Sequence, residues 1–218
     1  MQSAVLFDID GTLVDSNYLH IDAWARALEE VGHPADTWRI HRAIGMDSAL
    51  LLDSLLGEHA DALGERAKTR HGDLYREQAA RLRPFAGARD LVAELARRGT
   101  RVVLATSAPQ EELELLLKVL DVEEHLADYT SASDVENAKP EPDLIHAALE
   151  KAGVGPKRAV MVGDTVWDVE AAKRAGVSCV GVLSGGIGAE QLYDAGAVAV
   201  YSDVAELLLG IETSPLLR

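Results

Sequence analysis

Short apolar runs alternate with helical patterns over most of this chain, and that alternation restricts the fold more than any other feature. The runs are rich in β-branched residues and span 4–7, 101–105, 159–162, 178–182 and 197–200. Helical patterns lie between and after the later runs, at 88–98, 111–119, 142–152, 166–175 and 204–209. Strands that alternate with helices form a parallel sheet with helices on both faces, and such strands are apolar throughout. The sequence therefore predicts a Rossmann-like, three-layer α/β core.

The segment that follows the first strand has a different pattern. It contains four helical stretches and no strand pattern, with the stretches at 18–31, 36–44, 48–56 and 65–80. Breaks that contain glycine separate the stretches, and residues 83–87 form a return linker. The sequence predicts a core domain of residues 1–13 and 83–218, with a helical domain of residues 14–82 inserted into it.

Charge and composition exclude several classes of protein. The chain has 21 Lys and Arg residues against 36 Asp and Glu residues, a net charge of −15. Such an acidic chain is not expected to bind nucleic acid or an anionic membrane surface, and no apolar run approaches the roughly 18 residues of a membrane span. The single Cys179 excludes an intramolecular disulfide, and the first residues lack a signal-peptide pattern. We expect a cytoplasmic protein, as a monomer or small homo-oligomer.

Two carboxylates follow the first predicted strand, in Asp8-Ile9-Asp10-Gly11-Thr12. Ligands of open α/β sheets bind at the carboxyl ends of the strands, and residues two apart on a strand face the same way. Carboxylates this close repel each other unless a proton or cation lies between them. Mg²⁺ prefers such oxygen ligands and also binds substrate phosphate. The alternative is a capping turn, in which Asp10 and Thr12 bond only to the backbone.

A second acidic pair follows a later strand, in Gly163-Asp164-Thr165-Val166-Trp167-Asp168. Asp164 stands where the strand ends, and Asp168 is one helical turn further along the chain. Asp164 by itself could simply cap the helix that follows. Acidic residues at the ends of two strands of one parallel sheet instead favour a metal site built from oxygen ligands.

Anion-binding groups are predicted at two further loops. Thr106 and Ser107 end the strand at 101–105 and precede a helix, where a hydroxyl and unpaired backbone N–H groups can bind an anion. A plain helix cap is the alternative for this pair. Lys139 lies in Asn137-Ala138-Lys139-Pro140-Glu141-Pro142, where two prolines restrict the backbone more than a solvated lysine requires.

The order of these four segments resembles the four motifs of the haloacid dehalogenase superfamily of phosphohydrolases. The resemblance covers essentially the whole chain, and the helical insertion is similar to the family's cap domain. The segment from Asp8 to Ser16 carries the most specific match, whereas the Thr106-Ser107 motif is weak by itself. The resemblance implies an Mg²⁺-dependent phosphatase that hydrolyses a small phosphorylated metabolite through an aspartyl-phosphate.

The resemblance also implies a role for each matching residue. Asp8 matches the nucleophile, and Asp10 matches the general acid and base. Mg²⁺ is then held by Asp8, Asp164 and the backbone carbonyl of Asp10. Among the remaining matches, Ser107 beside Thr106 donates to the phosphoryl group, Lys139 offsets charge, and Asp168 orients the metal ligands or Lys139. Such positioning and electrostatic stabilisation dominate phosphoryl transfer, and a covalent carboxylate intermediate is nucleophilic catalysis.

Departures from the motifs narrow the choice of activity within the family. Dehalogenases lack an acid at the position of Asp10. The β-phosphoglucomutase branch is a closer alternative, because Asp15, His20 and Trp24 resemble its hinge and first cap helix. Mutases of that branch usually carry Glu-Asp where this chain has Gly163-Asp164, which favours a phosphatase. A non-catalytic protein that binds metal and phosphate is a third alternative, and the inserted cap argues against it.

Substrate selection is expected in the cap, which would close over the core. The candidates are His20, Arg42 and Gly45. Arg42 could bind a carboxylate or a second phosphate, although a surface arginine is an equally good interpretation. His20 is spaced four residues from Trp24, so it could instead be a packed histidine.

Overall fold

The computed structural model describes residues 3–135, 137 and 139–217, so Ala138 of the lysine motif lies outside the described residues. The chain divides into two compact units. One consists of Met1–Asp15 and Arg83–Arg218, and the other is Ser16–Leu82. We refer to them as the core unit and the helical unit.

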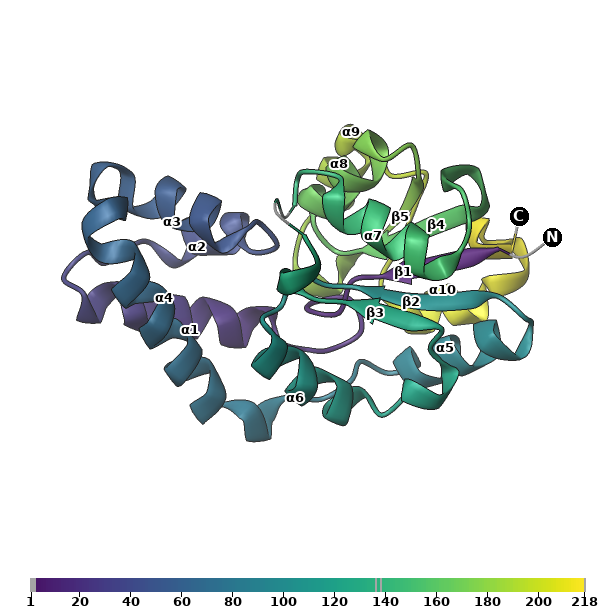
Figure 1. The fold of residues 1–218 in the computed structure, drawn as a ribbon, viewed down its shortest axis with the longest axis horizontal. Helices are drawn as coiled ribbons and strands as arrows, with labels where there is room; N and C mark the ends of the chain where they lie inside the picture. Colours follow the sequence, from purple (N-terminus) through teal and green to yellow (C-terminus); the bar gives the residue numbers. More distant parts are fainter. Residues whose placement is uncertain (1–2, 136, 138, 218) are drawn as a thin grey trace. The chain divides into compact units, whose positions relative to one another are not determined.

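The core unit is built on one six-stranded parallel sheet in the order β3-β2-β1-β4-β5-β6 (Figure 1). The strands are β1 (Ala4–Phe7), β2 (Arg101–Ala105), β3 (Asp128–Thr130), β4 (Ala159–Gly163), β5 (Ser178–Val182) and β6 (Ala199–Tyr201). All four residues of β1 are buried, as expected for a strand with a neighbour on each side and helices on both faces.

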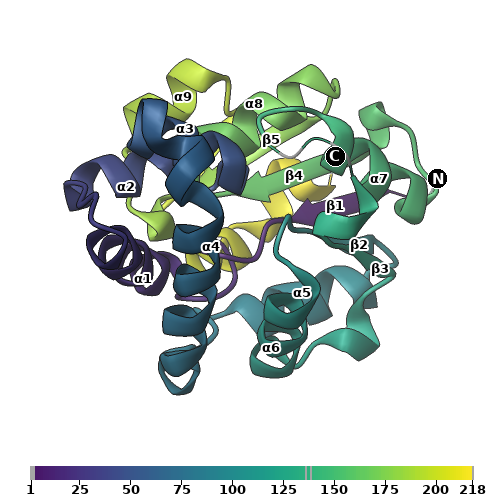
Figure 2. The same cartoon turned by 60° about the vertical axis from the view of Figure 1, so that its left-hand side comes forward.

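Helices cover both faces of this sheet, and Figures 1 and 2 show the two layers. One layer contains α7 (Asp143–Ala152), α8 (Val166–Arg174) and α9 (Ala189–Ala195), whose buried residues join the strands in one apolar cluster. The opposite layer contains α5 (Ala88–Arg97), α6 (Gln110–Leu120) and α10 (Val204–Leu209). The predicted α/β fold with a three-layer core is therefore confirmed.

The strand order determines where a ligand can bind. The chain builds the sheet outward from β1 to β3 and then returns to place β4 on the other side of β1. A crevice forms at the carboxyl edge of a parallel sheet where the order reverses in this way. The residues that follow β1 and β4 meet at this switch point, and they are the two acidic segments of the sequence.

The helical unit contains no strand among its residues, all of which the structure describes. Its helices are α1 (Asn17–Glu30), α2 (Thr37–Ala43), α3 (Ser48–Leu56) and α4 (Ala60–Glu77). α1 and α3 both pack on α4, and α2 packs on α1 and α3. The four helices enclose a second core that includes Leu28, Ile40 and Leu55. The last helix begins five residues before the predicted stretch at 65–80.

Short 3-10 turns connect these elements, at Gly57–His59, Ala79–Arg81, Glu123–His125, Ala132–Asp134, Pro156–Arg158 and Leu183–Gly185. Two more follow α10, at Ile211–Thr213 and Pro215–Leu217. Two elements have no counterpart among the sequence predictions, β3 and α9. β3 is a three-residue edge strand with only Thr130 buried, and α9 buries only Leu192, so neither gives a strong apolar pattern. No helix in the described part of the chain is long and apolar enough to cross a membrane.

Candidate active site

Asp8 is the first residue beyond β1, and its backbone still follows the sheet. Its N–H donates to the carbonyl of Val162 at 3.0 Å, which continues the ladder toward β4. The side chain is 9% exposed. The carboxylate is therefore held by the sheet at the switch point and is nearly removed from water.

A tight turn follows Asp8 and returns the chain away from the sheet edge. The carbonyl of Ile9 accepts from the N–H groups of Thr12, Leu13 and Val14, and Gly11 has a φ of 73°, in the left-handed region that glycine tolerates. Ser184 fastens this turn from the loop after β5, because its Oγ donates to the carbonyl of Gly11 at 2.6 Å. Ser184 is not among the residues predicted from the sequence, where its only signal is its position just after an apolar strand.

Lys139 joins the first acidic segment to the second. Its Nζ donates to Asp8 Oδ1 at 2.6 Å and to Asp168 Oδ1 at 2.7 Å. The lysine side chain is 2% exposed, so both ion pairs are buried. The loop between β3 and α7 thus brings a cation to the same edge of the sheet.

Asp168 is fixed from the other side by Thr165. Its Oδ2 accepts from the backbone N–H of Thr165 at 3.0 Å and from its hydroxyl at 2.7 Å. Thr165 in turn caps α8, so the two residues form a capping box. The cap of this helix is Thr165 rather than Asp164, and Asp164 Oδ1 instead accepts from the Thr12 hydroxyl at 2.9 Å.

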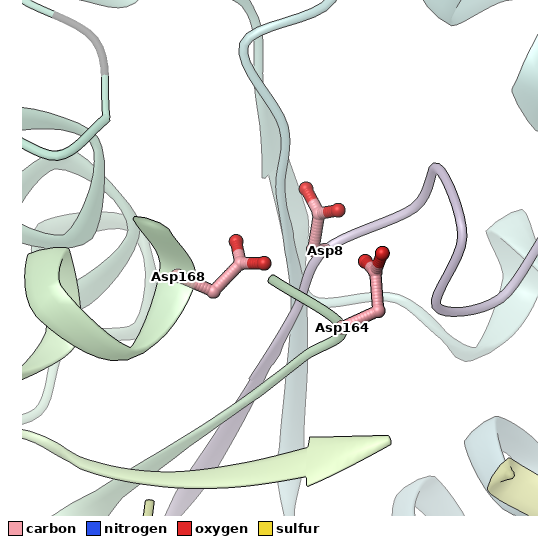
Figure 3. A group of neighbouring side chains, drawn as sticks. All are labelled: Asp8, Asp164 and Asp168. Atoms are coloured by element: carbon pink, nitrogen blue, oxygen red, sulfur yellow. The ribbon is translucent and has the colours of Figure 1, made fainter. Parts of the chain in front are cut away.

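Three buried carboxylates converge at this point, from Asp8, Asp164 and Asp168 (Figure 3). One oxygen of each lies within 4.8 Å of the others. When all three are ionised, they carry two negative charges more than Lys139, the ammonium paired with Asp8 and Asp168, balances. An oxygen-rich set with this charge fits a divalent cation such as Mg²⁺. Asp10 is outside this carboxylate cluster, and its predicted contribution through a backbone carbonyl stays a prediction.

The electrostatics of the site reflect burial and the neighbouring charges. Burial is the main cause that raises the pKa of Asp8 to about 7. The ammonium of Lys139 opposes this rise, whereas the negative charges of Asp168 and Asp10 add to it. Burial alone would lower the pKa of Lys139, but the carboxylates of Asp168 and Asp8 hold it above its usual value. Lys139 is therefore an ammonium, and extra positive charge at the site would favour the ionised form of Asp8.

The Thr106-Ser107 pair lies at the end of β2, the strand next to β1. The Thr106 side chain is buried, and its Oγ1 accepts from the backbone N–H of Ala108 at 3.0 Å. Thr106 therefore shapes this loop, which favours the capping interpretation for its hydroxyl. Ser107 is half-buried at the same carboxyl edge of the sheet, and its contact with substrate stays a prediction.

The three cap candidates all lie in the helical unit. His20 is 9% exposed, and its Nδ1 is 3.0 Å from Nε2 of His71. Its ring also stacks on Tyr75, with centroids 3.8 Å apart, so this geometry is that of a packed histidine. Arg42 is exposed, with its guanidinium 5.3 Å from the centre of the Trp38 ring. Gly45 has a φ of 89° in the turn between α2 and α3.

Comparison with known proteins decides the family. A sequence model of haloacid dehalogenase-like hydrolases matches residues 2–176. The chain belongs to this family. It is 33% identical over 203 residues to a phosphorylated carbohydrates phosphatase of Thermotoga maritima, with 90% of this chain and 93% of that protein covered. It is 34% identical over 217 residues to a phosphoglycolate phosphatase of Rhodospirillum rubrum, with 95% and 90% covered.

A solved structure supports the same assignment. The crystal structure of a hydrolase from Pseudomonas syringae superposes with a TM-score of 0.92 at 36% identity, covering 97% of this chain and 99% of that one. These haloacid dehalogenase-like relatives agree in the class of reaction, so the chain is an enzyme, a phosphoric monoester hydrolase. Phosphatases of this family typically use a divalent metal, and the acidic cluster at the switch point is able to hold one.

Proposed function

We propose that this chain is an Mg²⁺-dependent phosphatase that hydrolyses a small phosphomonoester through a phosphate ester of Asp8. The observation that carries the proposal is the environment of the Asp8 carboxylate. It is buried at the switch point, with Lys139 on Oδ1 at 2.6 Å and Asp164 in the same carboxylate cluster. A carboxylate held so rigidly and desolvated in this way is suited to act as a nucleophile.

In the first half-reaction, Asp8 Oδ2 attacks the phosphorus atom of the substrate. A bond forms between this oxygen and phosphorus, and the bond between phosphorus and the alcohol oxygen breaks. The carboxyl group of Asp10 gives its proton to the departing alcohol. Lys139 and the Ser107 hydroxyl hydrogen-bond to the phosphoryl oxygens and offset the charge that develops there.

In the second half-reaction, water attacks the phosphorus atom of the aspartyl-phosphate. The Asp10 carboxylate, left ionised by the first step, takes a proton from that water. The bond between phosphorus and Asp8 breaks, which releases inorganic phosphate and regenerates the Asp8 carboxylate. Asp10 is protonated again, so the site returns to its starting state.

The residues proposed to hold Mg²⁺ are Asp8, Asp164 and the backbone carbonyl of Asp10. When bound, the ion supplies positive charge beside the phosphoryl oxygens and the nucleophile. The hydrogen bond from Thr12 orients Asp164 for this role. Asp168 is not proposed as a ligand, because both its oxygens already accept hydrogen bonds, from Lys139 and from Thr165.

We assign substrate selection to the helical unit, as a cap that excludes water from the site and contacts the leaving group. The names of the two relatives, one acting on phosphorylated carbohydrates and one on phosphoglycolate, support a small phosphorylated metabolite as the substrate. The exposed Arg42 is the cap candidate best suited to bind an anionic group of such a molecule.

Phosphate release from a panel of small phosphomonoesters tests the proposal. The panel contains phosphoglycolate, several sugar phosphates, nucleoside monophosphates and an activated aryl phosphate, each with Mg²⁺ and with a chelator. We expect Mg²⁺-dependent release by the wild-type enzyme and none by Asp8→Asn. Release that persists unchanged in the chelator contradicts the metal requirement. If no ester is hydrolysed but a hexose 1-phosphate is isomerised in the presence of its bisphosphate, the enzyme is a mutase instead.

A further inference from the structure

Gly163, the last residue of β4, lies in immediate contact with the side chain of Asp168. A Cβ atom built on Gly163 would be 2.5 Å from both Cβ and Cγ of Asp168 and 2.7 Å from its Oδ2. Separations below 3.0 Å are essentially never found for real Cβ atoms. A side chain at position 163 and the observed position of Asp168 are therefore mutually exclusive.

Asp168 has no freedom to move aside. Its two carboxylate oxygens are engaged by Lys139 and by Thr165, at distances between 2.7 and 3.0 Å. The side chain is completely buried, and its Cβ belongs to the first turn of α8. Any shift that relieved the collision would therefore break hydrogen bonds in a closely packed region.

We infer that Gly163 is a positioning residue of the active site, whose missing side chain lets Asp168 reach Lys139. Through Lys139, this packing determines the direction of the ammonium that bonds to Asp8 Oδ1. In the Gly-Asp pair at 163–164, Asp164 thus provides a carboxylate, and Gly163 leaves the space that the side chain of Asp168 occupies. The structural part of this inference stands by itself, whereas its effect on catalysis rests on the proposed phosphatase function.

Because of this packing, a site of this kind can carry a carboxylate on residue 163 or on residue 168, but not on both. A carboxylate carried on residue 163, as in the Glu-Asp pair typical of the mutase branch, would need a residue at 168 with little or no side chain. This chain instead places its carboxylate on residue 168, where it binds Lys139. A side chain at position 163 is therefore compatible only with a smaller residue at position 168.

Gly181 provides a matched control, because it pairs with Gly163 in register across β4 and β5. A Cβ on Gly181 would also be crowded, at 2.9 Å from Cδ1 of Leu192 and 3.3 Å from Cγ2 of Val200. Those neighbours are apolar side chains with no bond to Lys139. Gly181→Ala therefore crowds a strand glycine, more mildly and mainly against the end of a leucine side chain, without touching the proposed machinery.

The experiment is a double-mutant cycle of Gly163→Ala, Asp168→Gly and the double variant, with Gly181→Ala as control. Thermal unfolding and kcat per mole of folded enzyme are measured for each. Gly163→Ala is expected to lower the Tm by about 2–10 °C through overpacking. In the Asp168→Gly background the same substitution is expected to change the Tm by less than about 2 °C, because the colliding atoms are gone.

Turnover distinguishes a positioning role from a merely structural one. We expect Gly163→Ala to lower kcat about 10-fold or more, Gly181→Ala to leave it within about twofold, and the double variant to match Asp168→Gly. Losses that multiply in the double variant overturn the inference, as does a Gly163→Ala enzyme with full kcat. If Gly163→Ala does not fold, the comparison is made between Asp168→Gly and the double variant. A double variant that is less stable than Asp168→Gly then overturns the inference. If the wild type releases no phosphate, the proposed function fails, and the Tm cycle still decides the steric coupling.

Discussion

The hydroxyl of Thr12 donates to Asp164 Oδ1 at 2.9 Å, between two fully buried side chains 152 residues apart in the chain. Thr12 belongs to the turn after β1, and Asp164 follows β4, the strand paired with β1. The bond fixes one acidic segment against the other. Because a hydrogen-bonded carboxylate presents its remaining lone pairs in a defined direction, Thr12 orients Asp164 for its proposed role as a metal ligand.

Replacement of Thr12 by valine tests this relationship. The substitution removes the donor with little change in shape, so Asp164 loses its orientation and a buried acceptor loses its partner. We expect the affinity for Mg²⁺ to fall about 10-fold or more, as is common for residues that orient metal ligands. Activation of phosphate release by Mg²⁺ and calorimetric titration both measure it. Thr12→Ser retains the hydroxyl and is expected to keep the wild-type affinity, and a Thr12→Val enzyme with that affinity contradicts the prediction.

Asp8→Asn tests the nucleophile. An amide is nearly isosteric with a carboxylate but does not attack phosphorus, so we expect kcat to fall by about 10⁴-fold or more. The fold should persist, because Asp8 also contributes a backbone bond to Val162 that the substitution leaves in place. Circular dichroism checks the fold, and the exposed Asp61→Asn is the control. Wild-type turnover in Asp8→Asn would disprove the covalent mechanism.

Lys139→Met tests the buried cation. The substitution leaves the carboxylates of Asp8 and Asp168 without the ammonium that balances them, and breaking a buried pair in this way costs about 3–5 kcal/mol. We expect the free energy of unfolding, measured in urea, to fall by about 3–5 kcal/mol and to recover partly when Mg²⁺ is added. The exposed Lys157→Met should leave stability unchanged. Equal stability of Lys139→Met and wild type in chelator would show that Lys139 does not balance this cluster.

The stability of the helical unit is expected to depend on pH, because His71 is buried beside His20. Burial and the neighbouring His20 lower the pKa of His71 from 6.5 to about 2. Below about pH 6.5 the unfolded chain takes up a proton at this histidine and the folded chain does not. The contribution of His71 to stability is therefore complete above pH 6.5 and is lost as the pH falls.

Urea unfolding between pH 7.5 and 5 measures this dependence. The free energy of unfolding of the wild type should fall by about 1.4 kcal/mol for each pH unit below 6.5 because of His71. His71→Gln should lack this contribution. The exposed His59→Gln is the matched control from the same unit and should follow the wild-type profile. Parallel pH profiles of wild type and His71→Gln would contradict the assignment.

The sequence by itself determined the α/β architecture, because most of its strands are apolar runs that alternate with helical patterns. β1, β2, β5 and α3 begin and end where the sequence predicts. β3 and α9 were missed because each buries only one residue, so neither imposes a pattern. Polar residues after apolar strands likewise identified Asp8 and Asp164 as neighbours, since parallel strands end at one edge of a sheet.

Tertiary structure decided what these side chains touch. Spacing along the chain does not reveal that Lys139 bonds to Asp8 and Asp168 together, or that the Thr12 hydroxyl donates to Asp164. The strand order brings these loops together, and contacts of 2.6–2.9 Å depend on packing that a linear pattern does not contain. His20 was ambiguous for the same reason, because only the fold of the helical unit supplies His71 and Tyr75 as its neighbours. Residue type and position along the chain predict which residues form the site, whereas the tertiary structure determines which residues they contact.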